Sequence, residues 1–376
     1  MLFSLFIYIT LFTVMSHSFA LYSKAYKNKD IKLTHPVILG PILLYTIIMG
    51  CRYGVGTDYF NYLELYEDVK YFEPNWTEFL FSSYTYVLSM NHVHFSFFFG
   101  IIAFIQIVFF VKAYKKFPKI LPLAIIFYFV GSYYLGWNNV LRQNLVVAIF
   151  LNMIPLIEKR KMGLYYLAAF LCIGIHLSSV LLFLIYPTLV FIEKHYKKNN
   201  IKLMLMVYVA FVGIGLFVDI FSYLFSNEFL LLFLLDTDYS SYAMNEGLMT
   251  AKTGSALGLG YLLKVTNRTL IILFSTRLLM YYKSTFVKYA FWLCYIGFCL
   301  HALFTTSIVL QRTNLFFISI ELIIVPFLWY YLLHKKSKYN KLNLLIFCFS
   351  FASYFLMFLT EIMKGKETTA EFHFFF

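Results

Sequence analysis

Four ionisable residues of types that bind anions or transfer protons adjoin apolar stretches of this chain. Arg52, Arg142 and Arg312 each lie beside an apolar run, and His176 lies in a short break between two such runs. A guanidinium stays charged and binds phosphate oxygens in pairs, whereas imidazole titrates near neutral pH and can act as a general base. Each arginine alone is explained by snorkelling or helix-end anchoring. Several at one membrane boundary favour a shared anionic ligand.

The segment RYGVGTDY at residues 52–59 is the sharpest local pattern. Gly54 and Gly56 permit positive φ or a close approach of backbone amides to a ligand. Thr57 or Asp58 could cap the helix that follows, and a helix N-terminus beside the arginine favours phosphate. An ordinary turn with an N-cap explains the segment equally well. It is not a dinucleotide-binding fingerprint, because it follows a membrane-spanning run and not a strand.

Amide side chains accompany two of the arginines. Residues 138–143 read NNVLRQ, which places two asparagines, Arg142 and Gln143 at a predicted helix start. Residues 311–314 read QRTN, which repeats the pattern of an arginine among amides. Because arginine matches phosphate oxygens bidentately, Arg142 is the first choice for the ligand of a diphosphate. His176 could serve as a general base, or it could simply be a hydrogen-bonding residue of a turn.

Further charged residues lie inside apolar runs. Lys264 and Arg268 are four residues apart and therefore share one helical face, which should line a polar cavity. Glu321 falls near mid-membrane, where a hydrogen bond or ion pair within the bundle explains it. His92 and His94 lie two residues apart, but no carboxylate or cysteine arrangement completes a metal site. We therefore predict neither a metal nor another cofactor.

Helices must position these residues, because the composition is that of a membrane protein. The chain is 61% hydrophobic and 13% charged, whereas soluble domains are about half apolar and a quarter charged. Apolar stretches of about 20 residues recur, and in lipid they must be helical. We predict an all-α, polytopic bundle of about 12 spans, between about 11 and 14, forming a single transmembrane domain over residues 1–376. The predicted spans are 2–22, 36–51, 94–111, 120–136, 140–157, 163–175, 177–192, 203–225, 257–279, 287–305, 313–333 and 343–362.

The stretch 163–192 is divided into two helices in this prediction. One helix of that length would measure about 45 Å, too long for the bilayer without steep tilt. It would also place the lysines that follow on the wrong side of the membrane. A turn at residues 176–179 resolves both problems.

The basic residues give the orientation. Most of the 31 lysines and arginines fall in alternate loops, which the positive-inside rule places in the cytoplasm. Arg52, Arg142, His176 and Arg312 then lie at the outer boundary, and both termini are predicted outside. Topology thus explains the formal net charge of +13, and no nucleic-acid partner is needed.

Two longer loops are predicted on the outer face, at about residues 52–93 and 226–256. The first is acidic, and its aromatic and aliphatic residues recur at helical spacing from Tyr59 onward. It is therefore expected to form one or two interfacial helices.

At these residues the chain resembles the EpsG-like, Wzy-type family of polysaccharide polymerases. The matching pieces are RYGVGTDYFNY at 52–62, LRQ at 141–143, HLSS at 176–179 and Arg312 in a late span. Their order and the topology also agree, so the resemblance covers most of the chain. Members often end in an aromatic stretch containing proline and a basic residue. The last residues, EFHFFF, lack both and are assigned no role.

The resemblance implies a glycosyltransferase at the outer face of the bacterial cytoplasmic membrane. It would join oligosaccharide repeat units carried on undecaprenyl diphosphate into O-antigen, capsule or exopolysaccharide, without a metal. Asp58 or His176 would be the base. Membrane lipid would be a further partner, and a chain-length regulator and a flippase could be others. The residues implied to bind diphosphate or substrate are Arg52, Tyr59, Arg142, Gln143 and Arg312, with Lys264 and Arg268 assisting.

Three other activities remain open from the sequence. A repeat-unit flippase or other transporter should place charges along a midplane path, often with symmetry between two halves, and neither is evident here. A membrane O-acyltransferase or a polymer-to-lipid ligase would also use polar residues at the outer face.

Overall fold

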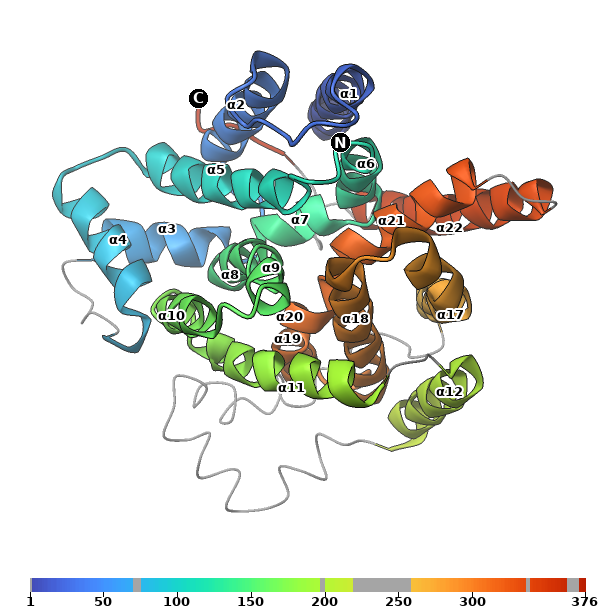
Figure 1. Cartoon of the computed structure of the whole chain (residues 1–376). Helices are drawn as coiled ribbons and strands as arrows, with labels where there is room; N and C mark the ends of the chain where they lie inside the picture. Colours follow the sequence, from blue (N-terminus) through green and yellow to red (C-terminus); the bar gives the residue numbers. More distant parts are fainter. Residues whose placement is uncertain (1, 70–75, 197–199, 219–257, 336–338, 364–371) are drawn as a thin grey trace. The chain divides into compact units, whose positions relative to one another are not determined.

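The computed structural model consists of helices and describes residues 2–69, 76–196, 200–218, 258–335, 339–363 and 372–376 (Figure 1). These residues form no strand, and their sole β-type pairing is an isolated antiparallel bridge between Arg52 and Phe374. The predicted all-α fold is confirmed. The predicted outer loop at 226–256 lies outside the described residues.

The chain divides into two compact units. The first contains Met1–Ile192 and Val325–Phe376, and the second contains Glu193–Ile324. The expectation of one transmembrane domain remains a prediction. The helices within the first unit are α1 (Leu2–Ala25), α2 (Pro36–Gly50), α3 (Tyr59–Glu67), the 3-10 helix η1 (Trp76–Glu78), α4 (Phe79–Met90), α5 (Phe95–Ala113), α6 (Leu121–Val130), α7 (Tyr133–Asn138), α8 (Leu141–Leu151), α9 (Ile154–Glu158), α10 (Met162–Ile173), the 3-10 helix η2 (Leu177–Leu181) and α22 (Asn340–Met363). Those within the second are α12 (Ile201–Phe217), α17 (Leu259–Tyr282), α18 (Thr285–Leu303), α19 (Ile308–Thr313) and α20 (Leu315–Ile318), while α11 (Leu182–His195) and α21 (Glu321–His334) each cross a boundary.

Several helices have the length and apolar character needed to cross a bilayer. Among the described residues, 7 segments qualify, and four more apolar helices are shorter. The chain is thus a multi-pass helical membrane protein. Helix α17 is 24 residues long but is not among the 7, and it carries Lys264, Arg268 and Arg277. The 7 segments are Phe3–Ala25, Phe95–Ala113, Leu141–Glu158, Leu177–His195, Thr285–Leu303, Leu315–His334 and Asn340–Met363.

Two breaks between helices bear on the predicted spans. The turn after α10 separates it from η2 and α11, as expected for the stretch 163–192. The span predicted at 120–136 was wrong as one helix, because α6 ends at Val130 and α7 begins at Tyr133. Ser132 between them has φ 62°, which a right-handed helix cannot contain.

Helices α2 and α5 pack closely against each other, and this contact positions the end of α2 (Figure 1). A Cβ on Gly50 would lie 2.7 Å from the Ser96 carbonyl oxygen and 3.1 Å from the Gly100 Cα. Small residues allow backbones to approach in this way inside membranes. Because Gly50 is the last residue of α2, the crossing point determines where Arg52 leaves the helix.

Helix α3 confirms the helical spacing seen in the first predicted outer loop. Tyr59, Tyr62, Leu63 and Tyr66 are all buried, on one face of the helix. They belong to a hydrophobic cluster with side chains of α4, α5 and α8, including Phe98. This cluster joins the loop helices to the membrane helices that carry the candidate site.

Candidate active site

Glu78 is the residue at which two of the predicted site residues meet. It ends η1, and only 3% of it is exposed. Its Oε1 accepts hydrogen bonds from His176 Nδ1 at 2.8 Å and from the Leu177 backbone N–H at 2.9 Å. Arg142 Nη1 donates to the other carboxylate oxygen, Oε2. The structure therefore brings Arg142 and His176 to one carboxylate, and we call these three residues the Glu78 cluster.

The turn after α10 holds the cluster together. The carbonyl oxygen of Gly174 accepts hydrogen bonds from two N–H groups in the first turn of α4, at 2.8 and 3.0 Å. A Cβ on Gly174 would lie 2.7 Å from a phenylalanine ring of α4, so glycine permits this approach. Glu78 immediately precedes α4, and His176 follows Gly174 by two residues. These backbone bonds therefore bring the carboxylate and the imidazole together.

Arg142 lies in the first turn of α8, against two aromatic rings. Its guanidinium carbon is 5.9 Å from the ring centre of Tyr62 and 5.5 Å from that of Phe81, within the range of cation–π contacts. The side chain of Arg142 is 32% exposed, against 4% for Glu78. A guanidinium has five N–H donors, so the bond to Glu78 leaves others that can bind an anion.

Charge in the cluster favours an ionised Glu78. Burial raises the pKa of this carboxyl, but the hydrogen bond from His176 and the charge of Arg142 outweigh burial and hold the pKa below its ordinary value. An ionised carboxylate has no proton to donate, so the proton in its bond with His176 belongs to Nδ1 of the imidazole. Nε2 of a neutral His176 then carries the lone pair that can accept a proton.

The glycine-rich turn at 52–58 is fastened to the start of α8. Asp58 Oδ2 accepts a hydrogen bond from the Val140 N–H at 2.9 Å, and Thr57 Oγ1 donates to Asn139 Oδ1 at 3.1 Å. Gly56 has φ +113°, and a Cβ there would lie 2.7 Å from the carbonyl oxygen of Asn138. The asparagines of the NNVLRQ segment thus bind the turn, and this arrangement orients the first turn of α8.

Arg52 is buried beneath the same turn. Its Nη1 donates to Asn138 Oδ1 at 2.7 Å, and its guanidinium carbon lies 5.1 Å from the ring centre of Phe99. No carboxylate of the described residues lies within ion-pair distance of it. Burial lowers the pKa of Arg52, and nearby tyrosines, Tyr45 first among them, partly offset this. Arg52 is therefore a buried cation that depends on amide and aromatic neighbours.

The aromatic tail, residues 372–376, lies across the end of α2. Its backbone pairs with residues 51–53: the Tyr53 N–H donates to the His373 carbonyl at 2.8 Å, and the Phe375 N–H donates to the Cys51 carbonyl at 3.2 Å. The Phe372 N–H donates to Ser4 Oγ at 2.8 Å. The tail, to which the sequence assigned no role, thus holds the segment that carries Arg52.

Two further predicted residues support this unit from within. Tyr59 is fully buried and stacks on Phe99, with ring centres 4.7 Å apart, under the Arg52 guanidinium. Gln143 is buried, and its Nε2 donates to Ser178 Oγ at 3.4 Å, which joins α8 to η2. Both therefore pack inside the first unit, beside residues predicted to bind the ligand.

The other predicted cations belong to the second unit. Arg268 Nε donates to Glu321 Oε1 at 3.0 Å, and both side chains are buried. The Arg268 guanidinium carbon also lies 5.4 Å from the ring centre of Phe298. Lys264 lies one helical turn before Arg268, and Arg312 lies in α19. A pocket shared by the cations of both units remains a prediction.

Glu78 was missed because its local sequence marks it only weakly. It is one of several acidic residues in the loop 52–93, and its partners lie 64 and 98 residues away. One signal was present: Glu78 stands directly before the apolar segment 79–88, where a charge is costly unless it is paired. For metals, the described residues offer no group of three His, Cys, Asp or Glu that could hold an ion.

The fold is that of a multi-pass helical membrane protein, and its Glu78 cluster joins a carboxylate, an imidazole and a guanidinium. The family model described as EpsG family matches residues 37–369, which is most of the chain. The chain therefore belongs to the EpsG family, a Wzy-like polysaccharide polymerase family. Membership indicates a membrane polysaccharide polymerase with glycosyltransferase-like activity. Searches of curated proteins and of solved structures found no match.

Proposed function

We propose that the protein polymerises oligosaccharide repeat units carried on undecaprenyl diphosphate, at the outer face of the bacterial cytoplasmic membrane. The observation that carries this proposal is the Glu78 cluster, where one buried carboxylate binds both an imidazole and a partly exposed guanidinium. Transfer of a glycan from a lipid diphosphate requires a base for the incoming hydroxyl and a cation for the departing diphosphate. The cluster contains one group of each kind.

The reaction is a substitution at the anomeric carbon of the donor glycan. A hydroxyl oxygen of the acceptor sugar forms the new bond to that carbon, and the bond from the carbon to the diphosphate oxygen breaks. The diphosphate leaves with the electron pair, and the hydroxyl proton passes to His176 Nε2. Arg142 stabilises the negative charge that develops on the leaving group. No metal is required for this scheme.

His176 is a better candidate for the base than Asp58. The Glu78 carboxylate orients the His176 ring and directs its free lone pair to Nε2. The Asp58 carboxylate accepts the Val140 N–H and so holds the turn before α8. We assign a positioning role to Asp58, Arg52 and Tyr59. Gln143 supports the site by joining α8 to η2 through its hydrogen bond to Ser178. This scheme uses groups of the first unit, and the assisting role predicted for Lys264, Arg268 and Arg312 stays a prediction.

The proposal is tested with purified protein and a purified lipid-linked repeat unit, with and without a chelator. The wild-type protein should produce a ladder of chain lengths under both conditions. His176→Asn and Arg142→Ala should lose the ladder while the protein level holds. Lys161→Ala is a matched control, because it removes an exposed basic residue outside the cluster. A ladder from His176→Asn at the wild-type rate would exclude His176 as the base, and a ladder that chelator abolishes would exclude the metal-free scheme.

Deletion of the gene separates the competing activities. Loss of a polymerase leaves single repeat units on the final acceptor, which is the expected result. Units trapped inside the cell would indicate a flippase, and chains of normal length would indicate an acyltransferase. Full-length chains that remain on the lipid carrier would indicate a ligase. A chain-length regulator and a flippase are the proposed protein partners.

A further inference from the structure

Two basic segments of the first unit are held together at one end of its helices. The first runs from the last turn of α1 to the start of α2, and the second runs from the last turn of α5 to the start of α6. The Ile31 N–H donates to the Lys115 carbonyl at 2.8 Å, which joins the two segments directly. Tyr22 secures the first segment, because its hydroxyl donates to the Asp30 carbonyl at 3.3 Å and accepts from the Lys32 N–H at 2.9 Å.

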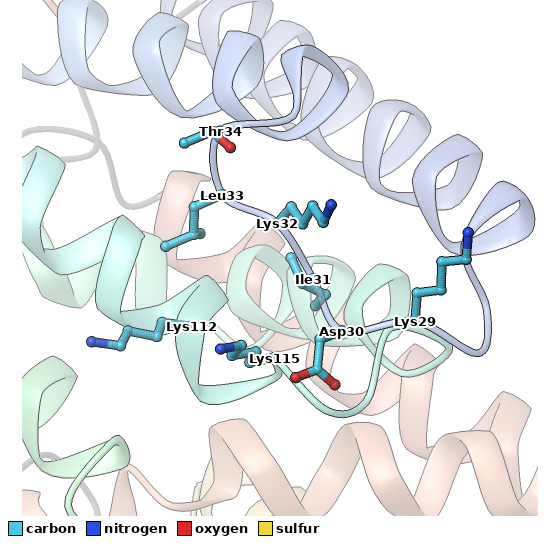
Figure 2. A pocket seen from close by; sticks show the side chains of 8 residues that line it. All are labelled: Lys29, Asp30, Ile31, Lys32, Leu33, Thr34, Lys112 and Lys115. Carbon is cyan, nitrogen blue, oxygen red and sulfur yellow. The ribbon is translucent and has the colours of Figure 1, made fainter.

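A hollow of about 440 Å³ lies between these segments (Figure 2). Four lysines line it against a single carboxylate, that of Asp30. Leu33 and Ile31 add apolar surface. None of the four ammonium groups forms an ion pair with a carboxylate of the described residues. The lysines, which come from both segments, are Lys29, Lys32, Lys112 and Lys115.

Four lysines around one hollow require more explanation than lysines spread over a loop, although their ammonium groups point in different directions (Figure 2). The positive-inside rule accounts for basic residues in both segments. It does not require four of them to line one hollow beside a single carboxylate, which leaves a local excess of positive charge there. The hollow is therefore suited to an anionic group in addition to the Asp30 carboxylate.

The position of the hollow indicates the source of that anion. It lies where α1 and α5 end and α2 begins; α1 and α5 contain candidate membrane spans, and α2 is apolar. The ends of such helices lie at the depth of lipid headgroups, and basic hollows between membrane helices bind phosphate-bearing headgroups. We propose that the four lysines bind the phosphate of an anionic phospholipid, on the side of the membrane that carries the basic loops. This site is independent of the polymerisation chemistry.

The test uses native mass spectrometry of the full-length protein in detergent, with short-chain phosphatidylglycerol as the probe and phosphatidylcholine as the neutral comparison. A variant with all four lining lysines changed to glutamine should bind phosphatidylglycerol about tenfold or more weakly than the wild type. The matched control removes four lysines from the same two segments that do not line the hollow. It should retain binding within about twofold of the wild type. The control substitutions are Lys24→Gln, Lys27→Gln, Lys116→Gln and Lys119→Gln.

Each outcome either supports or overturns the proposed phospholipid site. Equal loss in the two quadruple variants would mean that diffuse surface charge binds the lipid, and equal binding of phosphatidylcholine would mean that the headgroup charge is not recognised. Either result overturns the site. Inorganic phosphate forms a further arm: if it binds through the four lysines and phosphatidylglycerol does not, the lipid assignment is wrong. The double variants Lys29→Gln/Lys32→Gln and Lys112→Gln/Lys115→Gln repeat the test if the quadruple variant misfolds. Polymerisation, measured separately, should not change.

Discussion

Replacement of Glu78 with glutamine perturbs the Glu78 cluster with almost no change of shape. The amide carries no charge and has one acceptor oxygen in place of two. Both carboxylate oxygens are engaged, Oε1 by His176 and the Leu177 N–H, and Oε2 by Arg142. The amide NH₂ group must therefore face a donor on one side or the other. Either His176 or Arg142 loses its acceptor.

The size of the effect follows from burial. Removal of one partner from a buried ion pair costs about 3–5 kcal/mol. Arg142 is 32% exposed, so water can solvate part of the released charge, and we expect a loss of about 1–3 kcal/mol of stability. The polymerisation rate should also fall. A positioned general base contributes about 10²–10⁴-fold, so loss of the orientation of His176 should slow polymerisation by about 10²-fold.

The assay is the initial rate of ladder formation from a lipid-linked repeat unit, with thermal unfolding of the same samples. Glu64→Gln is the control, because Glu64 lies on the exposed face of α3 and its substitution removes an equal charge. We expect the control to match the wild type in both measurements. A Glu78→Gln rate within about twofold of the wild type, beside an inactive His176→Asn protein, would refute the orienting role of Glu78.

Three further results are expected. Because the folded-state pKa of Glu78 lies below its ordinary value, ionised Glu78 stabilises the fold at neutral pH, and this contribution disappears as the pH falls below about 4.3. The difference in melting temperature between the wild type and Glu78→Gln should therefore be largest at pH 7 and shrink in acid. A difference that stays constant with pH would contradict this. Gly56→Ala should cost about 1–3 kcal/mol, because φ is +113° and the Cβ would lie 2.7 Å from a backbone oxygen. The control is Gly136→Ala in α7, where nothing lies within 4 Å; in thermal melts it should equal or slightly exceed the wild type. Equal losses in the two variants would argue against strain at Gly56. Arg268→Gln should lower the free energy of unfolding by about 3–5 kcal/mol, because it removes the guanidinium that faces the buried Glu321 carboxylate. In a double-mutant cycle, adding Glu321→Gln should restore much of this stability. Additive losses would show that the pair is not coupled.

The class of the protein and the location of most helices were determined by the sequence alone. Apolar runs of bilayer length are local properties, and in lipid such runs must be helical. The break in 163–192 was predictable, because a single helix would have been too long. The break before α7 was not predicted, although Gly131 and Ser132 mark it, because the apolar run continues through them.

Some residues of the Glu78 cluster could also be singled out from the sequence. Arg142 and His176 were selected because ionisable groups beside apolar runs are costly and need a reason. The glycines at 54 and 56 indicated an unusual turn, and both have positive φ. What these residues contact could not be obtained in the same way.

Only the tertiary structure decided those contacts. Glu78 reaches its partners across 64 and 98 residues, and the N–H of Phe372 meets Ser4 across 368. The hollow lined by lysines likewise forms where two separate segments meet. The physical reason is that helix propensity and hydrophobicity are properties of short stretches of sequence, and they determine where single helices form. The contact between distant segments depends instead on close approaches, such as those at Gly50 and Gly174, that only the folded packing creates.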